Sequence, residues 1–238
     1  MKIVAIDSSS MVASVAVWED DIILAEYTIN HKKTHSQTLL PMLDEIKKMI
    51  ELDMDTVDGI AVTGGPGSFT GLRIGSATAK GVGLALNIPI INVPTMDAMA
   101  YNLYGIDGLI CPIMDARRTQ VFTGIYRFEN KKMITVKEQA PMDLLELIDE
   151  LNNMGEKVTF TGDGIASYGE LIKENMNVEY EFPPAHLNRQ RAAALATLAA
   201  EYMKNNMQER IETAGEHSPE YLRLSQAERE RNNAMKGE

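Results

Sequence analysis

The amino-acid sequence predicts an α/β protein built from two duplicated halves, each with the element order βββαβα. Short apolar runs of strand length alternate with longer runs of helical periodicity along most of the chain. Acidic turns at Asp7 and Asp115 each end one apolar run and precede an alternating strand, 108 residues apart. The segments AVTGG (61–65) and TFTGD (159–163) also resemble each other. Together these repeats indicate an internal duplication.

The first half begins with three predicted strands joined by the turns at Asp7 and at 19–21. A helix is expected next, because its apolar residues recur at spacings of four, three and four. Pro41 must lie in the first turns of this helix or kink it. Thr95 is expected to cap a later helix. The predicted strands are 2–6, 13–18, 22–28, 59–63 and 88–93, and the predicted helices are 36–52, 71–86 and 95–103.

The second half repeats this order in a shorter form. Its predicted strands are 109–114, 121–127, 133–136 and 157–161, and its predicted helices are 142–152 and 166–176. We therefore expect a first domain at 1–106 and a shortened second domain at 107–190. A final Ala- and Leu-rich helix, 191–204, should complete the first domain. Residues 205–238 form a C-terminal segment, and its polar end, 225–238, is expected to fray.

Composition limits the function. The chain has 238 residues and a formal net charge of −11. Such a charge repels a phosphate backbone, so this chain alone is not expected to bind nucleic acid strongly. The single cysteine, Cys111, cannot form an internal disulfide and is expected to be a buried thiol. No apolar run is long enough to span a membrane, so we expect no membrane contact and a cytoplasmic location.

A glycine-rich loop, TGGPGSFTGLRIG (63–75), joins a predicted strand to a predicted helix, an arrangement that often holds phosphate. The Walker loop needs a lysine at the helix start, but the first lysine here is Lys80. The dinucleotide motif needs a sixth-place glycine, where this chain has Thr70. Both specific motifs fail, and a looser anion site made of backbone amides stays open.

Few polar residues form a recognisable chemical site. Asp7, Ser8 and Ser9 are the candidate cofactor-binding residues, although Asp and Ser also favour ordinary turns, and we favour that interpretation. His31 and His35 have the spacing of a zinc helix but lack the glutamate of the protease motif. We therefore expect no metal site and no catalytic residues.

Two adjacent arginines follow the second acidic turn. Arg117 and Arg118 could bind an anion or pair with the many acidic residues, and we favour pairing.

Small residues recur every four positions along the helix after the glycine loop. Each helical glycine costs about 1 kcal/mol relative to alanine, so a close neighbouring backbone must offset the cost. That neighbour is either in the same domain or in another chain, and we favour another chain. A smooth stripe of this kind would also allow a C2 homodimer of the isolated chain. The predicted partner interface comprises Leu39, Met42, Leu43, Ile46, Met49, Gly71, Leu72, Gly75, Ala79 and Gly83.

Two halves that each open βββ with an acidic turn resemble the actin-like ATPase (ASKHA, RNase H-like) fold. In active members of that fold the first turn contacts phosphate. More specifically, the sequence resembles the TsaB (YeaZ) family from residue 1 to about 227. The segments that carry this resemblance are IDSSS, IAVTGGPGSFTGLRIGSATAKGVGLAL, MDARRTQVF and PEYLRLSQAE.

The resemblance implies a non-catalytic subunit that supports threonylcarbamoyl transfer to adenosine 37 of tRNA. Its partners would be a TsaD-type catalytic subunit, bound through helices 36–52 and 71–86, and a TsaE-type P-loop ATPase. It would meet tRNA only through the complex. The related enzyme has a metal-binding histidine pair where this chain has Asn92 to Met99, which include no histidine.

No cofactor is therefore expected, and ATP or ADP would bind only weakly or at the partner interface. The alternative is an active ATPase or small-molecule kinase of the actin-like fold.

Overall fold

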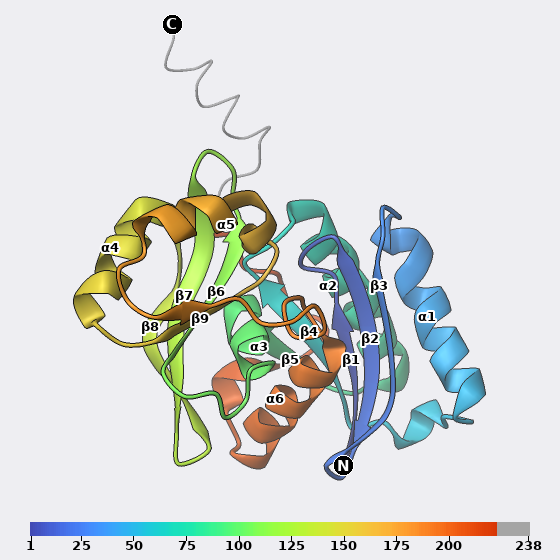
Figure 1. The fold of residues 1–238 in the computed structure, drawn as a ribbon. Coiled ribbons are helices and arrows are strands. Elements are labelled where there is room, and N and C mark those ends of the chain that lie inside the picture. Colours follow the sequence, from blue (N-terminus) through green and yellow to red (C-terminus); the bar gives the residue numbers. More distant parts are fainter. Residues whose placement is uncertain (223–238) are drawn as a thin grey trace, which may run out of the picture.

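Two mixed sheets with the same strand order organise residues 1–222, the part of the chain that the computed structural model describes (Figure 1). The first sheet has the order β11-β5-β4-β1-β2-β3 and the second has the order β10-β9-β6-β7-β8. In each sheet the first strand of the half pairs antiparallel with the next strand and parallel with the fourth. The predicted fold class, a duplicated α/β fold of the actin-like ATPase type, is confirmed.

The elements follow the predicted order. The first half contains β1 (Lys2–Asp7), β2 (Val12–Glu19), β3 (Ile22–Asn30), α1 (His35–Met49), a 3₁₀ turn (Met54–Thr56), β4 (Gly59–Gly65), α2 (Phe69–Leu86), β5 (Ile90–Pro94) and α3 (Thr95–Tyr101). The second contains β6 (Leu109–Asp115), β7 (Gln120–Glu129), β8 (Lys132–Asp143), α4 (Leu144–Met154), β9 (Val158–Thr161), α5 (Gly164–Asn175) and β10 (Tyr180–Glu181). The chain continues with α6 (Ala192–Lys204), a 3₁₀ turn (Gln208–Arg210) and β11 (Ile211–Glu212).

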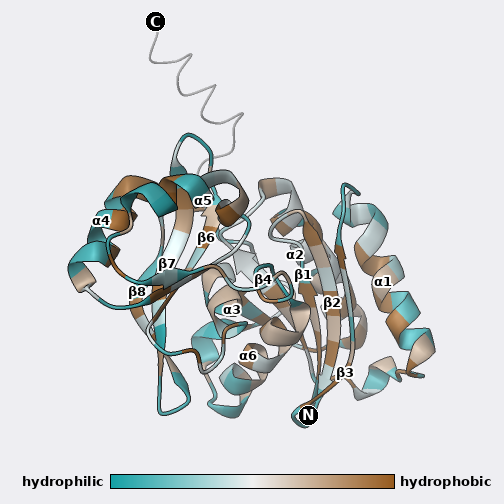
Figure 2. Ribbon diagram, in the orientation of Figure 1, coloured by the Kyte–Doolittle hydropathy of each residue, from teal (hydrophilic) through white to brown (hydrophobic). Residues whose placement is uncertain are grey.

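Strands β1, β2, β4 and β5 of the first sheet are buried on both faces, whereas the edge strand β3 is largely exposed. Alternate residues of β1 and β2, including Val4 and Val15, pack with α1 and α2. The residues between them, including Ile3 and Trp18, pack with α6 on the opposite face. Figure 2 shows hydrophobic residues along β1 and β2 and hydrophilic residues on much of α4. Helix α6 therefore returns from the far end of the chain to cover the first sheet.

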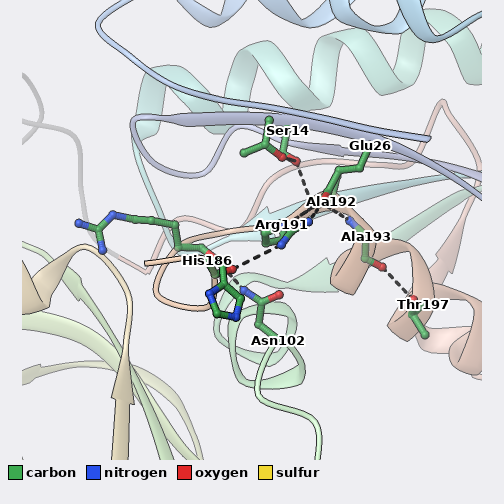
Figure 3. Close-up of polar contacts among 10 residues, drawn as sticks. Ser14, Glu26, Asn102, His186, Arg191, Ala192, Ala193 and Thr197 are labelled. Atoms are coloured by element: carbon green, nitrogen blue, oxygen red, sulfur yellow. Dashed lines mark hydrogen bonds and ion pairs between the residues drawn. The ribbon is translucent and has the colours of Figure 1, made fainter. Parts of the chain in front are cut away.

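Polar contacts with strands β2 and β3 hold the start of α6 against the first half (Figure 3). No side chain caps this helix from its own N-cap, Arg191. Instead, Ala192 N donates to Ser14 Oγ at 2.9 Å, and Ala193 N donates to Glu26 Oε1 at 3.0 Å. Arg191 also forms an ion pair with Glu26. Strands β2 and β3 thus satisfy N–H groups at a helix terminus that is remote in sequence.

Several boundaries differ from those predicted. Helix α1 ends at Met49 rather than 52, and Pro41 lies inside it. Thr95 is the first residue of α3, and no side chain caps that helix, so the predicted cap is wrong. Strand β8 has 12 residues where four were predicted. It is an edge strand, and its apolar residues do not alternate with burial, since Ile134 and Val136 are both exposed.

The C-terminal segment packs on the first half as far as it is described. Strand β11 pairs antiparallel with β5 at the edge of the first sheet. Further on, Glu220 N donates to Gly64 O at 2.6 Å. The predicted fraying of 225–238 concerns residues outside the described part. Within residues 1–222, no helix is both long and apolar enough to cross a membrane.

Candidate functional site

The turn after β1 is stabilised by hydrogen bonds to the side chain of Asp7. Asp7 ends β1, and its Oδ1 accepts hydrogen bonds from Ser9 N (2.9 Å), Ser9 Oγ (2.7 Å) and Thr63 Oγ1 (3.2 Å). The carboxyl group is 1% exposed, and its burial raises its pKa. Such a bond from a backbone N–H two residues on is the usual turn chemistry of aspartate. The Asp7 carboxylate therefore serves the fold.

The glycine loop closes directly on this turn. Ser68 N donates to Ser9 O at 2.7 Å, and Ser8 Oγ donates to Gly71 O at 2.9 Å. A Cβ on Gly67 would lie 2.4 Å from Ser9 O, which no side chain tolerates. The loop needs glycine here because two backbone segments of the same chain touch.

The small-residue stripe of α2 faces its own domain. A Cβ on Gly75 would lie 2.3 Å from Ser8 Oγ, and one on Gly83 would lie 3.3 Å from both Ala214 Cβ and Ile88 O. The prediction that this stripe packs against another chain is wrong, because the first turn, β5 and the C-terminal segment already cover it. Most of the other predicted interface residues are also buried inside the chain, namely Leu39, Met42, Leu43, Ile46, Leu72 and Ala79.

The opposite sides of α1 and α2 face outward. Three apolar side chains of these helices are exposed: Met49, the one predicted interface residue that is exposed, at a relative exposure of 76%, Leu40, which projects from a different side of α1, at 55%, and Leu84 at 65%. On α2 this outward side also carries Ala77 and Gly81, and a Cβ on Gly81 would meet nothing within 4 Å. We call these residues the outer α1–α2 side. It combines exposed apolar side chains with small residues that permit close approach.

A cleft of about 850 Å³ lies between the two halves. Its walls include the first turn, the glycine loop, the start of α2, the turn after β6 and residues 220–222. Of the three predicted cofactor-binding residues, Ser9 lines this cleft, whereas Asp7 and Ser8 do not. The volume suits a small molecule, but the hydroxyl groups of Ser8 and Ser9 are engaged within the fold, with Gly71 O and Asp7 Oδ1.

The second acidic turn differs from the first in its exposure. Asp115 is exposed and lines the cleft. Its carboxylate accepts hydrogen bonds from Arg117 N (2.7 Å), Ser167 Oγ (3.1 Å) and Tyr168 OH (2.8 Å). The duplication has thus kept an aspartate at the end of each first strand while changing its surroundings.

The two arginines of this turn are placed differently from the prediction. Arg117 and Arg118 are exposed, and neither side chain forms an ion pair with any residue of the range 1–222. The number of acidic residues predicts ion pairs for these arginines, and within residues 1–222 that prediction is wrong. The turn leaves both guanidinium groups beyond ion-pair distance of the described carboxylates.

The remaining candidate residues are His31, His35 and Cys111. His35 Nε2 bonds Ser10 O at 2.7 Å, and His31 is exposed on the preceding loop. Within the described residues, no group of three His, Cys, Asp or Glu side chains gathers as a metal site would require. Cys111 is a buried free thiol, as predicted, and burial raises its pKa to about 12.

Sequence reasoning missed an aromatic contact at the lip of the cleft. The rings of Phe69 and Tyr221 lie 4.6 Å apart, and the Arg73 guanidinium lies 4.1 Å from the Phe69 ring centroid. Arg73 Nε also donates to Tyr221 OH at 3.1 Å. No short-range pattern signals this contact, because 148 residues separate Arg73 from Tyr221.

Comparison with known proteins gives consistent matches. The family model described as TsaD, tRNA N6-adenosine threonylcarbamoyltransferase, matches residues 22–231. The tRNA threonylcarbamoyladenosine biosynthesis protein TsaB of Bacillus subtilis is 33% identical over 230 residues, covering 96% of each chain. The TsaB protein of Escherichia coli is 31% identical, covering 74% of this chain and 77% of its own length.

Among solved structures, YeaZ from Pseudomonas aeruginosa superposes with a TM-score of 0.76 at 24% identity. The match covers 93% of this chain and 99% of that one. At this identity the match shows the shared fold.

Proposed function

The chain belongs to the TsaB (YeaZ) family of tRNA threonylcarbamoyladenosine biosynthesis proteins, and from that premise we propose that it is the non-catalytic subunit of a tRNA threonylcarbamoyltransferase complex. A TsaD-type partner would bind the substrates and carry out the transfer to adenosine 37. A TsaE-type P-loop ATPase would join the complex, and tRNA would meet this chain only within it.

The closed first turn is the observation that carries this proposal. In active actin-like ATPases the first turn contacts phosphate, but here Asp7 accepts three hydrogen bonds from its own chain. The glycine loop is bonded to the turn through Ser68 N and Ser9 O. A phosphate could replace these contacts only if the loop opened. This geometry supports the proposal that the chain keeps the fold in order to dock a partner protein.

The outer α1–α2 side is the docking surface we assign to the TsaD-type partner. The family resemblance points to these two helices, and the structure leaves their outward sides free. Leu40, Met49 and Leu84 would supply apolar contact, and Gly81 would let a partner helix approach α2 closely. The same side would also serve a homodimer of the isolated chain, in competition with the partner.

Reconstitution tests the proposal. Threonylcarbamoyl transfer to tRNA is measured with the TsaD-type protein and the TsaE-type ATPase of the same organism, with and without this chain. We expect transfer only when this chain is present. In addition, substitutions at Asp7 that preserve folding should leave transfer intact. Full transfer without this chain would contradict an accessory role.

The cleft keeps one second candidate function open, an ATPase or kinase activity. Its volume of about 850 Å³ is large enough for a nucleotide. Calorimetry with Mg-ATP tests this alternative on the isolated chain. Micromolar binding accompanied by turnover would favour it over the accessory role.

A further inference from the structure

The turn between β6 and β7 presents two exposed arginines on an acidic protein. Arg117 and Arg118 are exposed, and within residues 1–222 neither forms an ion pair. Two other arginines do form ion pairs, Arg127 with Glu156 and Arg191 with Glu26. The net charge of −11 reflects many carboxylates, yet within residues 1–222 none of them forms an ion pair with Arg117 or Arg118.

The backbone that carries these arginines is strained and firmly held. Arg117, Arg118 and Thr119 have φ values of 67°, 57° and 61°, a left-handed conformation that is unfavourable for residues with a side chain. Hydrogen bonds maintain it: Ala116 N donates to Gln120 O at 2.9 Å, and Leu144 N donates to Thr119 O at 2.9 Å. The two arginines therefore project from a fixed position, which lowers the entropy lost on binding a ligand.

The position of the pair favours a ligand outside the cleft. Arg117 lines the cleft, whereas Arg118 does not. The cleft wall also carries the carboxylates of Asp115, Asp163 and Glu220, which would repel a phosphate lodged inside without a cation. A phosphate chain running across the mouth would meet both guanidinium groups and stay farther from these carboxylates.

We propose that Arg117 and Arg118 bind backbone phosphates of the tRNA on which the complex acts. This inference rests on the proposed function, since tRNA would reach the chain only in the complex. Guanidinium groups bind phosphate oxygens in a bidentate manner, and such contacts position a nucleic acid without reading its sequence. Two contacts on a strongly acidic chain would add to the affinity of the complex but would not bind tRNA alone.

The test uses the assembled complex and two matched double variants. Arg117→Ala/Arg118→Ala removes the pair. Lys131→Ala/Lys132→Ala removes the same charge from the exposed turn at the other end of β7, where within residues 1–222 these lysines also have no ion pair. Light scattering first checks that each variant still joins the complex. The dissociation constant for tRNA is then measured across a salt series.

We expect the arginine variant to weaken tRNA binding several-fold and to lower the slope of log K against log salt by roughly 1 to 2, since each lost phosphate contact removes about 0.7 to 0.9. The lysine variant should match the wild type. Arg117→Lys/Arg118→Lys should keep most of the salt slope and part of the affinity.

Three results would overturn the inference. Unchanged tRNA binding in the arginine variant would do so, and so would equal weakening in both variants, which would indicate only general charge. A third is an arginine variant whose isolated chain loses ADP binding while its complex loses only the same tRNA affinity as the lysine variant, which would assign the pair to a nucleotide in the cleft. If the wild-type chain forms no complex with the TsaD-type protein, the proposed function fails first, and light scattering shows this separately.

Discussion

A Cβ atom on Gly71 would lie 2.1 Å from the carbonyl oxygen of Ser8. Helix α2 and the turn after β1 therefore touch through their backbones, and glycine is the residue that permits it. The hydrogen bond from Ser8 Oγ to Gly71 O, at 2.9 Å, holds the two segments together. This contact fixes the start of α2 against the turn after β1.

Two glycines of the same helix should respond oppositely to alanine. Gly71→Ala forces backbone against backbone and should destabilise the protein by about 1–3 kcal/mol. Gly81→Ala meets nothing within 4 Å and should stabilise the helix by up to about 1 kcal/mol. Urea unfolding of both variants provides the measurement. Equal effects of the two substitutions would show that the first turn and α2 are not in contact.

The buried carboxyl of Asp7 predicts a pH effect. Burial raises its folded-state pKa above the ordinary value of 3.8, so the folded state holds this proton more tightly than the unfolded state does. The resulting contribution to stability is complete below pH 3.8 and is lost as pH rises through the raised pKa. The free energy of unfolding of Asp7→Asn, relative to wild type, should therefore increase with pH. Unfolding measured between about pH 4 and 8 checks this, and a pH-independent difference would contradict it.

The start of α6 should depend on a serine that is far away in sequence. Ser14→Ala removes the acceptor of Ala192 N and should lower the free energy of unfolding by about 1–2 kcal/mol, as the loss of a helix cap does. Ser36→Ala, at an exposed position of α1, is the control and should change stability by less than about 0.5 kcal/mol. Thermal unfolding distinguishes them. Similar effects of the two substitutions would argue against this remote cap.

Sequence patterns predicted the duplicated fold well because most strands are short apolar runs, buried along their length, between longer runs of helical spacing. Helical spacing also identified the small-residue side of α2. It could not tell which backbone that side faces, because the answer depends on Ser8, which lies 63 residues before Gly71. The residues predicted to bind a partner were consequently taken from the buried side of each helix, and Met49 was the exception.

Contacts that lack a local pattern escaped prediction. Strand β11 has two residues, too few to show alternation. The pairing expected for Arg117 and Arg118 came from the number of acidic residues, and charge balance contains no geometry. Their left-handed backbone leaves both residues exposed, and such a conformation has no signal in a sequence that lacks glycine at these positions.

The proposed docking of a TsaD-type partner on the outer α1–α2 side is tested most directly by molar mass from light scattering. The wild-type chain mixed with the TsaD-type protein of its own organism should give a 1:1 complex. Leu84→Glu, which places a charge on this side, should stay folded and prevent the complex. Ile134→Glu, at an exposed position of β8, should leave it intact. A complex that forms equally with Leu84→Glu, or the absence of any complex with the wild type, would contradict the account.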